Sequence, residues 1–178
     1  FAVIIAIGCN NEKKTEKMDE QENFYSVEVN KYHEFELTAD LSQLSENQKN
    51  MLPILLEVAK IMDELHWQTA CGPYRTYLDS LSDEDAKKLF MINYGPWNRL
   101  GGNESFVQGV GEKPLGAFFY PVDMTKEEFE NWIKDHPEDE KAFKSEFTVI
   151  RRDGDRLVAI PYNEYYKDHL KEAHDLLK

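Results

Sequence analysis

The chain has 178 residues, of which 41% are hydrophobic and 12% aromatic, a composition typical of one globular domain with its own core. Its 34 acidic and 21 basic side chains give a net charge of −13, and the acids are scattered along the sequence rather than gathered in one tail. Because an acidic chain gains nothing from counterion release at a phosphate backbone, we expect no nucleic acid partner.

The first residues predict a lipid anchor. Residues 1–7 are all apolar and run into Gly8-Cys9, and a short apolar run that ends in small residues is typical of a secretory signal. A cysteine after such a run resembles a bacterial lipobox, whose thiol takes up diacylglycerol; the alternative is a buried strand that ends at a chance cysteine. Residues 10–23 contain one apolar side chain, which favours a charged tether behind an anchor. We therefore expect lipidation at Cys9 and a place in the bacterial cell envelope, periplasmic or surface-exposed.

The segment after the tether is expected to be extended. Residues 24–42 carry aromatic and β-branched side chains without helical spacing, and we expect them to pack Tyr32, Phe35 and Leu37 onto the body. The chain is thus divided into a signal over 1–9, a tether and extended lead-in over 10–34, and a domain over 35–178.

Two helices are expected in the middle of the chain. The first begins near Ser45, a capping residue, continues with apolar residues at i+3 and i+4 spacing, and ends at Cys71-Gly72-Pro73. Pro53 lies inside this pattern and predicts either a kink or the true start of the helix. The second helix is expected from Ser82, with acidic residues in its first turn, to just before Gly95-Pro96. We expect Cys71 to act as a small buried hydrophobe at a helix end.

The C-terminal part predicts both helices and strands. Thr125 and Glu128 form a potential capping box, and Pro137 can open a short helix. Two β-branched runs over 146–161 flank Asp153-Gly154-Asp155, which predicts a hairpin. The expected fold class is therefore α+β, mostly helical with one β-hairpin near residues 146–161.

A last helix is expected from Asn163, and its sequence "HLKEAH" contains two histidines. Residues five apart on a straight helix point about 140° away from each other, so His169 and His174 do not share a face. His169 and Glu172 could share one, but two ligands fall short of the three that a catalytic zinc needs. We therefore expect a solvated surface and no metal here, with the apolar residues of the helix on one face: Tyr166, Leu170, Ala173 and Leu177.

The stretch over 92–121 is the strongest candidate for a ligand site. Its glycines do not form the G-x-G-x-x-G pattern of a dinucleotide fold, which excludes that class of nucleotide site. Loops of more than about 20 residues are uncommon in compact domains and are often functional. Aromatic side chains beside polar ones suit the wall of a cleft, although a loop that covers a core fits the same residues equally well.

Three segments of the sequence, in this order along the chain, carry a resemblance to a known family: "LTADLSQLSENQKNMLPILLEVAKIMDELHWQ", "INYGPWNRLGGNESFVQGVGEKPLGAFFYPVDMTKEEFE" and "FTVIRRDGDRLVAIPYNEYY". Together they resemble the N-terminal part of bacterial dipeptidyl peptidase III-like zinc metallopeptidases, in the lipoprotein form of Bacteroidetes-type bacteria. The resemblance implies the N-terminal part of a two-lobed exopeptidase whose zinc motif is H-E-x-x-G-H or H-E-x-x-x-H. "HLKEAH" has Leu170 where that motif requires glutamate, so the resemblance implies zinc in the full-length parent and none bound by this chain.

The resemblance also implies a role for the glycine-rich stretch. This chain would supply no catalytic residue, but it would line the cleft for short peptides and pack against the zinc lobe of the parent chain. The residues expected to bind substrate are Asn93, Trp97, Asn98, Gly116, Phe118, Phe119 and Tyr120. The expected function is thus that of a cleft wall in a zinc-dependent exopeptidase that removes dipeptides from peptide N-termini. The alternative is a cell-envelope lipoprotein that binds peptides or another ligand without catalysis.

Overall fold

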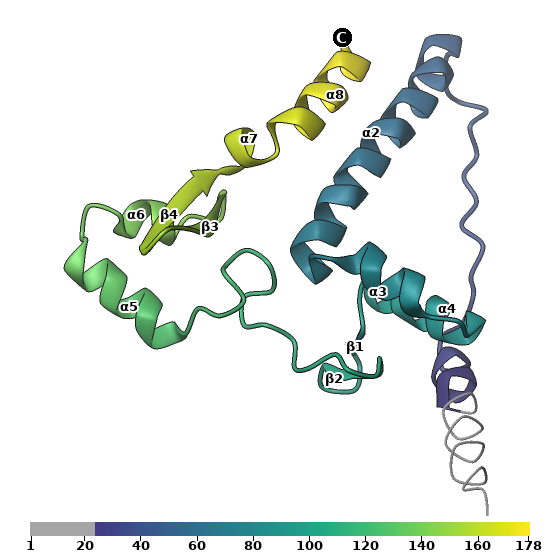
Figure 1. Ribbon diagram of the computed structural model, residues 1–178. Coiled ribbons are helices and arrows are strands. Elements are labelled where there is room, and N and C mark those ends of the chain that lie inside the picture. The colour runs from purple at the N-terminus through teal and green to yellow at the C-terminus, as the bar shows by residue number, and fades with distance from the viewer. Residues whose placement is uncertain (1–23) are drawn as a thin grey trace, which may run out of the picture.

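The computed structural model describes residues 24–178. The expected anchor at Cys9, the signal over 1–9 and the tether over 10–23 lie outside the described residues. The described chain consists of helices and two small antiparallel sheets of two strands each, which confirms the α+β class (Figure 1). None of its helices is both long enough and apolar enough to cross a membrane.

The longest element is helix α2, Glu46–Cys71. Its first turn is closed by a capping box in which the Ser45 side chain accepts from the Gln48 amide and the Gln48 side chain accepts from the Ser45 amide. Pro53 lies inside the helix, so the helix begins at the capping serine and not at the proline. It ends where expected, at Gly72, whose φ of +62° suits a residue without a Cβ.

Two shorter helices follow α2. Helix α4, Glu84–Asn93, is capped by Asp83, whose carboxylate accepts from the Ala86 amide at 2.7 Å, so it starts two residues later than expected. Helix α3, Tyr74–Ser80, was not expected from the sequence. It has only seven residues and no side chain caps it, which leaves no local signal, and the burial of Tyr74 ties it to the core.

These helices enclose the first core cluster, which lies around the C-terminal half of α2. Trp67 stacks on Tyr74 at 4.8 Å and on Phe90 at 5.7 Å between ring centroids. The buried members of the cluster are Tyr25, Trp67, Cys71, Tyr74, Ala86, Leu89, Phe90, Trp97, Phe106 and Val107.

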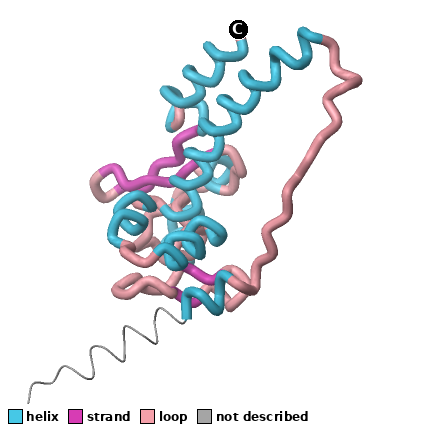
Figure 2. Tube along the Cα trace, turned by 90° about the vertical axis from the view of Figure 1, so that its right-hand side faces the viewer, coloured by secondary structure: helices cyan, strands magenta, loops and turns pink. Residues whose placement is uncertain are grey.

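The lead-in to α2 differs from its prediction. Residues 24–29 are helical rather than extended, and this short helix is held by the Tyr25 hydroxyl, which donates to the Phe106 carbonyl at 2.8 Å. Tyr32 packs on the first core cluster as expected. Phe35 and Leu37 do not, being 76% and 88% exposed, because the chain from 33 to 44 runs apart from the body to the N-terminus of α2 (Figures 1 and 2).

The glycine-rich stretch contains a miniature sheet that was not expected. Strand β1, Trp97–Asn98, pairs antiparallel with strand β2, Glu104–Ser105, in the register Trp97↔Ser105. Strands of two residues carry no alternating pattern that a sequence could reveal.

The second core cluster lies between two helices and the expected hairpin. Strands β3, Thr148–Asp153, and β4, Arg156–Pro161, pair in the register Asp153↔Arg156, so Gly154-Asp155 form the turn as predicted. Phe143, Ile150 and Leu157 are the buried members of the cluster. Helix α5, Lys126–Asp135, and helix α6, Glu140–Phe143, cover it. Of the expected capping box, the structure shows Thr125 accepting from the Glu128 amide, and α6 begins after Pro137 rather than at it.

The last expected helix is divided in two. Helix α7, Tyr162–Tyr165, and helix α8, Lys167–Leu177, meet at Tyr166, whose ψ of 20° departs from helical geometry. Helix α8 packs alongside α2 (Figure 1). Tyr166 and Ala173 are buried as expected, whereas Leu177 is 57% exposed.

Candidate ligand-binding site

The segment 116–121 joins the two core clusters. The Phe118 amide donates to the Thr69 carbonyl of α2 at 3.0 Å, and the Ile150 amide of β3 donates to the Phe119 carbonyl at 2.8 Å. The Arg151 guanidinium adds bonds to both carbonyls, from Nη2 to Phe118 at 3.0 Å and from Nη1 to Phe119 at 3.1 Å. The backbone of this aromatic segment is therefore fixed from α2 on one side and from the hairpin on the other.

Two glycines let aromatic rings lie directly on the backbone. Gly116 has a φ of +72°, and a Cβ there would lie 2.4 Å from the Tyr120 ring. At Gly72 a Cβ would lie 2.4 Å from the Phe118 ring. Both distances are far shorter than a carbon–carbon contact allows, so any larger residue would displace these rings.

Two of the expected binding residues, Asn93 and Phe119, line a common pocket with a cavity volume of about 230 Å³. It lies where the end of α2, the end of α4 and the glycine-rich stretch meet. Its lining consists of His66, Thr69, Ala70, Asn93, Tyr94, Arg99, Lys113, Ala117 and Phe119.

The other expected binding residues lie elsewhere. Trp97 is 3% exposed in the first core cluster, and its indole Nε1–H donates to the Gly111 carbonyl at 2.9 Å. Asn98 holds a turn, because its side chain accepts from the Leu100 and Gly101 amides. Phe118 packs against the first cluster and Tyr120 against the second. Gly116 lines a neighbouring groove of the glycine-rich stretch, about 760 Å³ in volume. Whether these residues touch a ligand stays a prediction.

The sequence reading did not assign His66, Tyr94, Arg99 and Lys113 to a site. The two cations lie in the glycine-rich stretch, which was singled out for aromatic side chains beside polar ones, with Arg99 among the polar ones but not among the expected binding residues. His66 belongs to the pattern of α2, where its spacing indicates a core-facing helix position. It stands edge-on to the Tyr94 ring at 4.7 Å.

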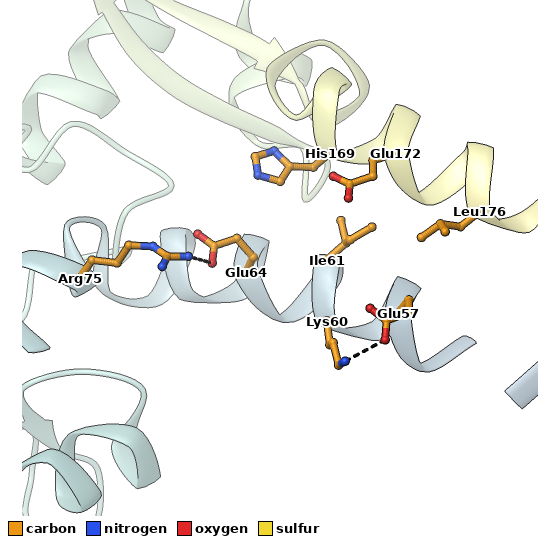
Figure 3. A pocket seen from close by; sticks show the side chains of 8 residues that line it. All are labelled: Glu57, Lys60, Ile61, Glu64, Arg75, His169, Glu172 and Leu176. Carbon is orange, nitrogen blue, oxygen red and sulfur yellow. Dashed lines mark hydrogen bonds and ion pairs between the residues drawn. The ribbon is translucent and has the colours of Figure 1, made fainter. Parts of the chain in front are cut away.

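The first histidine of "HLKEAH", His169, borders a different pocket, of about 500 Å³, between α2 and α8 (Figure 3). His169 and Glu172 line it from α8, whereas His174 is exposed and not part of the lining. Across the pocket, Glu64 is already engaged by the Tyr74 hydroxyl and by Arg75 Nη2, each at 2.6 Å. Burial opposes ionisation of Glu64, but its hydrogen bonds outweigh that effect and lower the pKa of the carboxyl.

Zinc does not fit this stretch. Within residues 24–178, no group of three or more histidine, cysteine, aspartate or glutamate side chains is placed to hold a metal ion. His169 and Glu172 would offer two ligands where a catalytic zinc takes three from the protein. That "HLKEAH" binds no catalytic metal stays a prediction.

Cys71 takes the structural role expected of it. It is fully buried at the end of α2, and burial raises the pKa of its thiol to about 12, against an opposing effect of Lys113. The thiol is therefore protonated at neutral pH and is not an activated nucleophile.

Comparison with known proteins shows which solved structures share this architecture. No family model matches the chain. The solved structure of DPP III from Caldithrix abyssi superimposes with a TM-score of 0.79 and 45% identity, covering 86% of this chain and 30% of that one. The described region is dipeptidyl peptidase III-like. Dipeptidyl-peptidase III from Corallococcus sp. strain EGB superimposes with a TM-score of 0.74 and 29% identity over 89% of this chain and 30% of its own.

The likeness confirms the resemblance to dipeptidyl peptidase III and places the chain as part of a dipeptidyl peptidase III-like lobe, while the lipoprotein form stays a prediction. The chain spans about 30% of the length of both solved structures. Among curated proteins, Nudix hydrolase 3 of Arabidopsis thaliana is 28% identical over 208 residues, covering 85% of this chain and 27% of its own length. The dipeptidyl peptidase III-like region thus also matches about a quarter of a protein with a different name.

Proposed function

We propose that this chain is part of a zinc-dependent exopeptidase that removes dipeptides from the N-termini of short peptides. The 45% identity to a dipeptidyl peptidase III over 86% of the chain carries the proposal. The zinc and its ligands would belong to the parent protein outside this chain. The described region would supply a wall of the substrate cleft at the pocket lined by Asn93 and Phe119.

The experiment that tests the activity is hydrolysis of a dipeptidyl-arylamide by the full-length protein, with zinc measured by mass spectrometry in the same preparation. Release of the arylamine, lost on chelation and restored by zinc, is the expected result. A folded, zinc-loaded protein that binds peptides without cleaving them would overturn the exopeptidase and favour the peptide-binding lipoprotein.

Phe119 is the aromatic side chain best placed to contact a peptide, because it is half-buried and lines the pocket. In the full-length protein we expect Phe119→Ala to raise KM by roughly five- to thirtyfold, the effect of losing about 1–2 kcal/mol of apolar contact. Zinc content should not change. Phe147→Ala is the matched control, because Phe147 is 72% exposed outside the pocket. Equal KM values for Phe119→Ala and the parent would remove Phe119 from the cleft.

We also propose that the protein is anchored through lipid at Cys9 in a bacterial cell envelope. The proposal rests on the apolar run before Cys9 and the charged residues after it. Cells that express the protein should incorporate a fatty-acid analogue into it, and Cys9→Ala should abolish this labelling. Equal labelling of both proteins would refute the anchor.

A further inference from the structure

The pocket between α2, α4 and the glycine-rich stretch has a charge opposite to that of the chain. Among the described residues that line it, the side chains with a fixed charge are Arg99 and Lys113, in a protein of net charge −13. No aspartate or glutamate is among the described residues that line it. Within residues 24–178 neither cation forms an ion pair with a carboxylate.

Both cations are held at the pocket by contacts that leave their charge free. The Arg99 amide donates to Asn93 Oδ1 at 2.9 Å, while the Asn93 Nδ2 donates to the Leu89 carbonyl, so α4 fixes the backbone of Arg99. The Lys113 ammonium lies 5.9 Å from the centre of the Trp97 ring, a cation–π distance that leaves its N–H donors available.

The neighbouring polar groups are largely occupied. The Thr69 hydroxyl donates to the His66 carbonyl, and both polar atoms of the Asn93 amide are engaged. The carboxylate of Asp63, which is not part of the lining, accepts from the Tyr94 hydroxyl at 2.8 Å. The donors left for a ligand are therefore the two cations and the His66 ring.

We propose that this pocket binds a carboxylate group of a peptide, so that the protein prefers acidic peptides or peptides with a free C-terminus. The inference deepens the proposed function, on which it rests for the peptide nature of the ligand. A cavity of about 230 Å³ holds one small side chain or terminal group rather than a whole peptide. Carboxylates are the peptide groups that paired cations recognise through charge-assisted hydrogen bonds.

Calorimetric binding of N-acetylated peptides to the full-length protein tests this proposal, because a blocked N-terminus prevents removal of a dipeptide. One pair, acetyl-Ala-Ala-Glu-amide and acetyl-Ala-Ala-Gln-amide, isolates a side-chain carboxylate. A second pair, acetyl-Ala-Ala-Ala as the free acid and as the amide, isolates the C-terminal carboxylate. We expect the carboxylate member of at least one pair to bind about tenfold more tightly, and that pair identifies the source.

Charge-removing variants then locate the preference. Arg99→Gln and Lys113→Gln together should bring the ratio of the two Kd values close to one. Lys88→Gln is the control, because Lys88 is an exposed cation of α4 outside the pocket; its replacement removes one positive charge, as each of the two pocket substitutions does.

Equal binding within both pairs by the parent protein would overturn the proposal, as would a loss of preference in Lys88→Gln equal to that in the double variant. Arylamide hydrolysis decides the exopeptidase separately, since its substrate carries no carboxylate. If the protein cleaves arylamides but shows no carboxylate preference, only the carboxylate pocket is refuted. If it shows the preference but cleaves no arylamide, only the exopeptidase activity is refuted.

Discussion

Replacing Trp97 by alanine is expected to lower the free energy of unfolding by about 3–5 kcal/mol, the cost of emptying the space of a large buried aromatic ring. The indole is 3% exposed in the first core cluster. Its N–H donor to Gly111 fixes the loop on which Lys113 follows two residues later. Chemical denaturation of the purified variant measures the loss.

Two further variants separate the causes of this effect. Trp97→Phe keeps most of the ring but not the donor, so we expect a smaller loss of about 1 kcal/mol from the hydrogen bond together with the missing ring volume. Leu100→Ala, at a side chain 80% exposed beside the same small sheet, should change stability by less than about 0.5 kcal/mol. Unchanged stability of Trp97→Ala together with a raised KM would show that Trp97 serves the cleft and not the core.

Arg151→Met should cost about 2–4 kcal/mol of stability, because the guanidinium is the side chain that ties the hairpin to the aromatic segment. It donates to the carbonyls of Phe118 and Phe119, donates to the Tyr165 hydroxyl from two nitrogens, and lies 4.6 Å from the centre of the Tyr165 ring. Hydrogen bonds to a charged group contribute more than neutral ones, although their contributions do not add.

The same variant should raise KM, since loosening the carbonyl of Phe119 lets its ring leave the pocket. Arg151→Lys keeps the charge without the planar fork and should recover only part of both losses. Arg156→Met is the matched control, because Arg156 is an exposed arginine at the turn of the same hairpin. If Arg151→Met left the free energy of unfolding unchanged, the attachment of the segment would have to come from the backbone bonds alone.

The parts of the fold that the sequence predicted are those with local chemical signals. The helix cap at Ser45 and the turn at Gly154 each depend on side chains within a few residues, and both are present. Helix α3 and the helix over 24–29 carry no such signal. They are held by contacts that no local pattern encodes: the Tyr25 hydroxyl donates to the carbonyl of Phe106, 81 residues away, and Tyr74 stacks on Trp67 of α2.

The candidate site was predictable to a lesser degree. Asn93 and Phe119 were placed in the right stretch by their type and by the resemblance, and they line one pocket. Trp97 was expected to bind substrate on the same grounds, but it lies in the core. The sequence does not show whether an aromatic ring in a loop points toward the core or toward a cleft. The sequence also did not predict that Arg99 and Lys113 line the same cavity, because no sequence pattern relates two cations that only the fold brings together.

The exposed lead-in over 33–44 sets a limit on chain length. Tyr32 packs on the first core cluster, which lies around the C-terminal half of α2, while Ser45 caps the opposite end of that helix. At 1.5 Å per residue, the helix from Glu46 to Trp67 is roughly 30 Å long. A fully extended chain from Tyr32 to Ser45 reaches at most roughly 45 Å.

The helix therefore takes up about two thirds of the reach of this connector, and the remaining roughly 15 Å corresponds to about four extended residues. A deletion of more than about four residues within 33–44 would have to unwind the first turn of α2 or pull the 24–29 helix away from Phe106. An insertion would cause neither change. Among related chains, longer connectors should therefore be accepted freely, whereas shortening should be limited to about four residues.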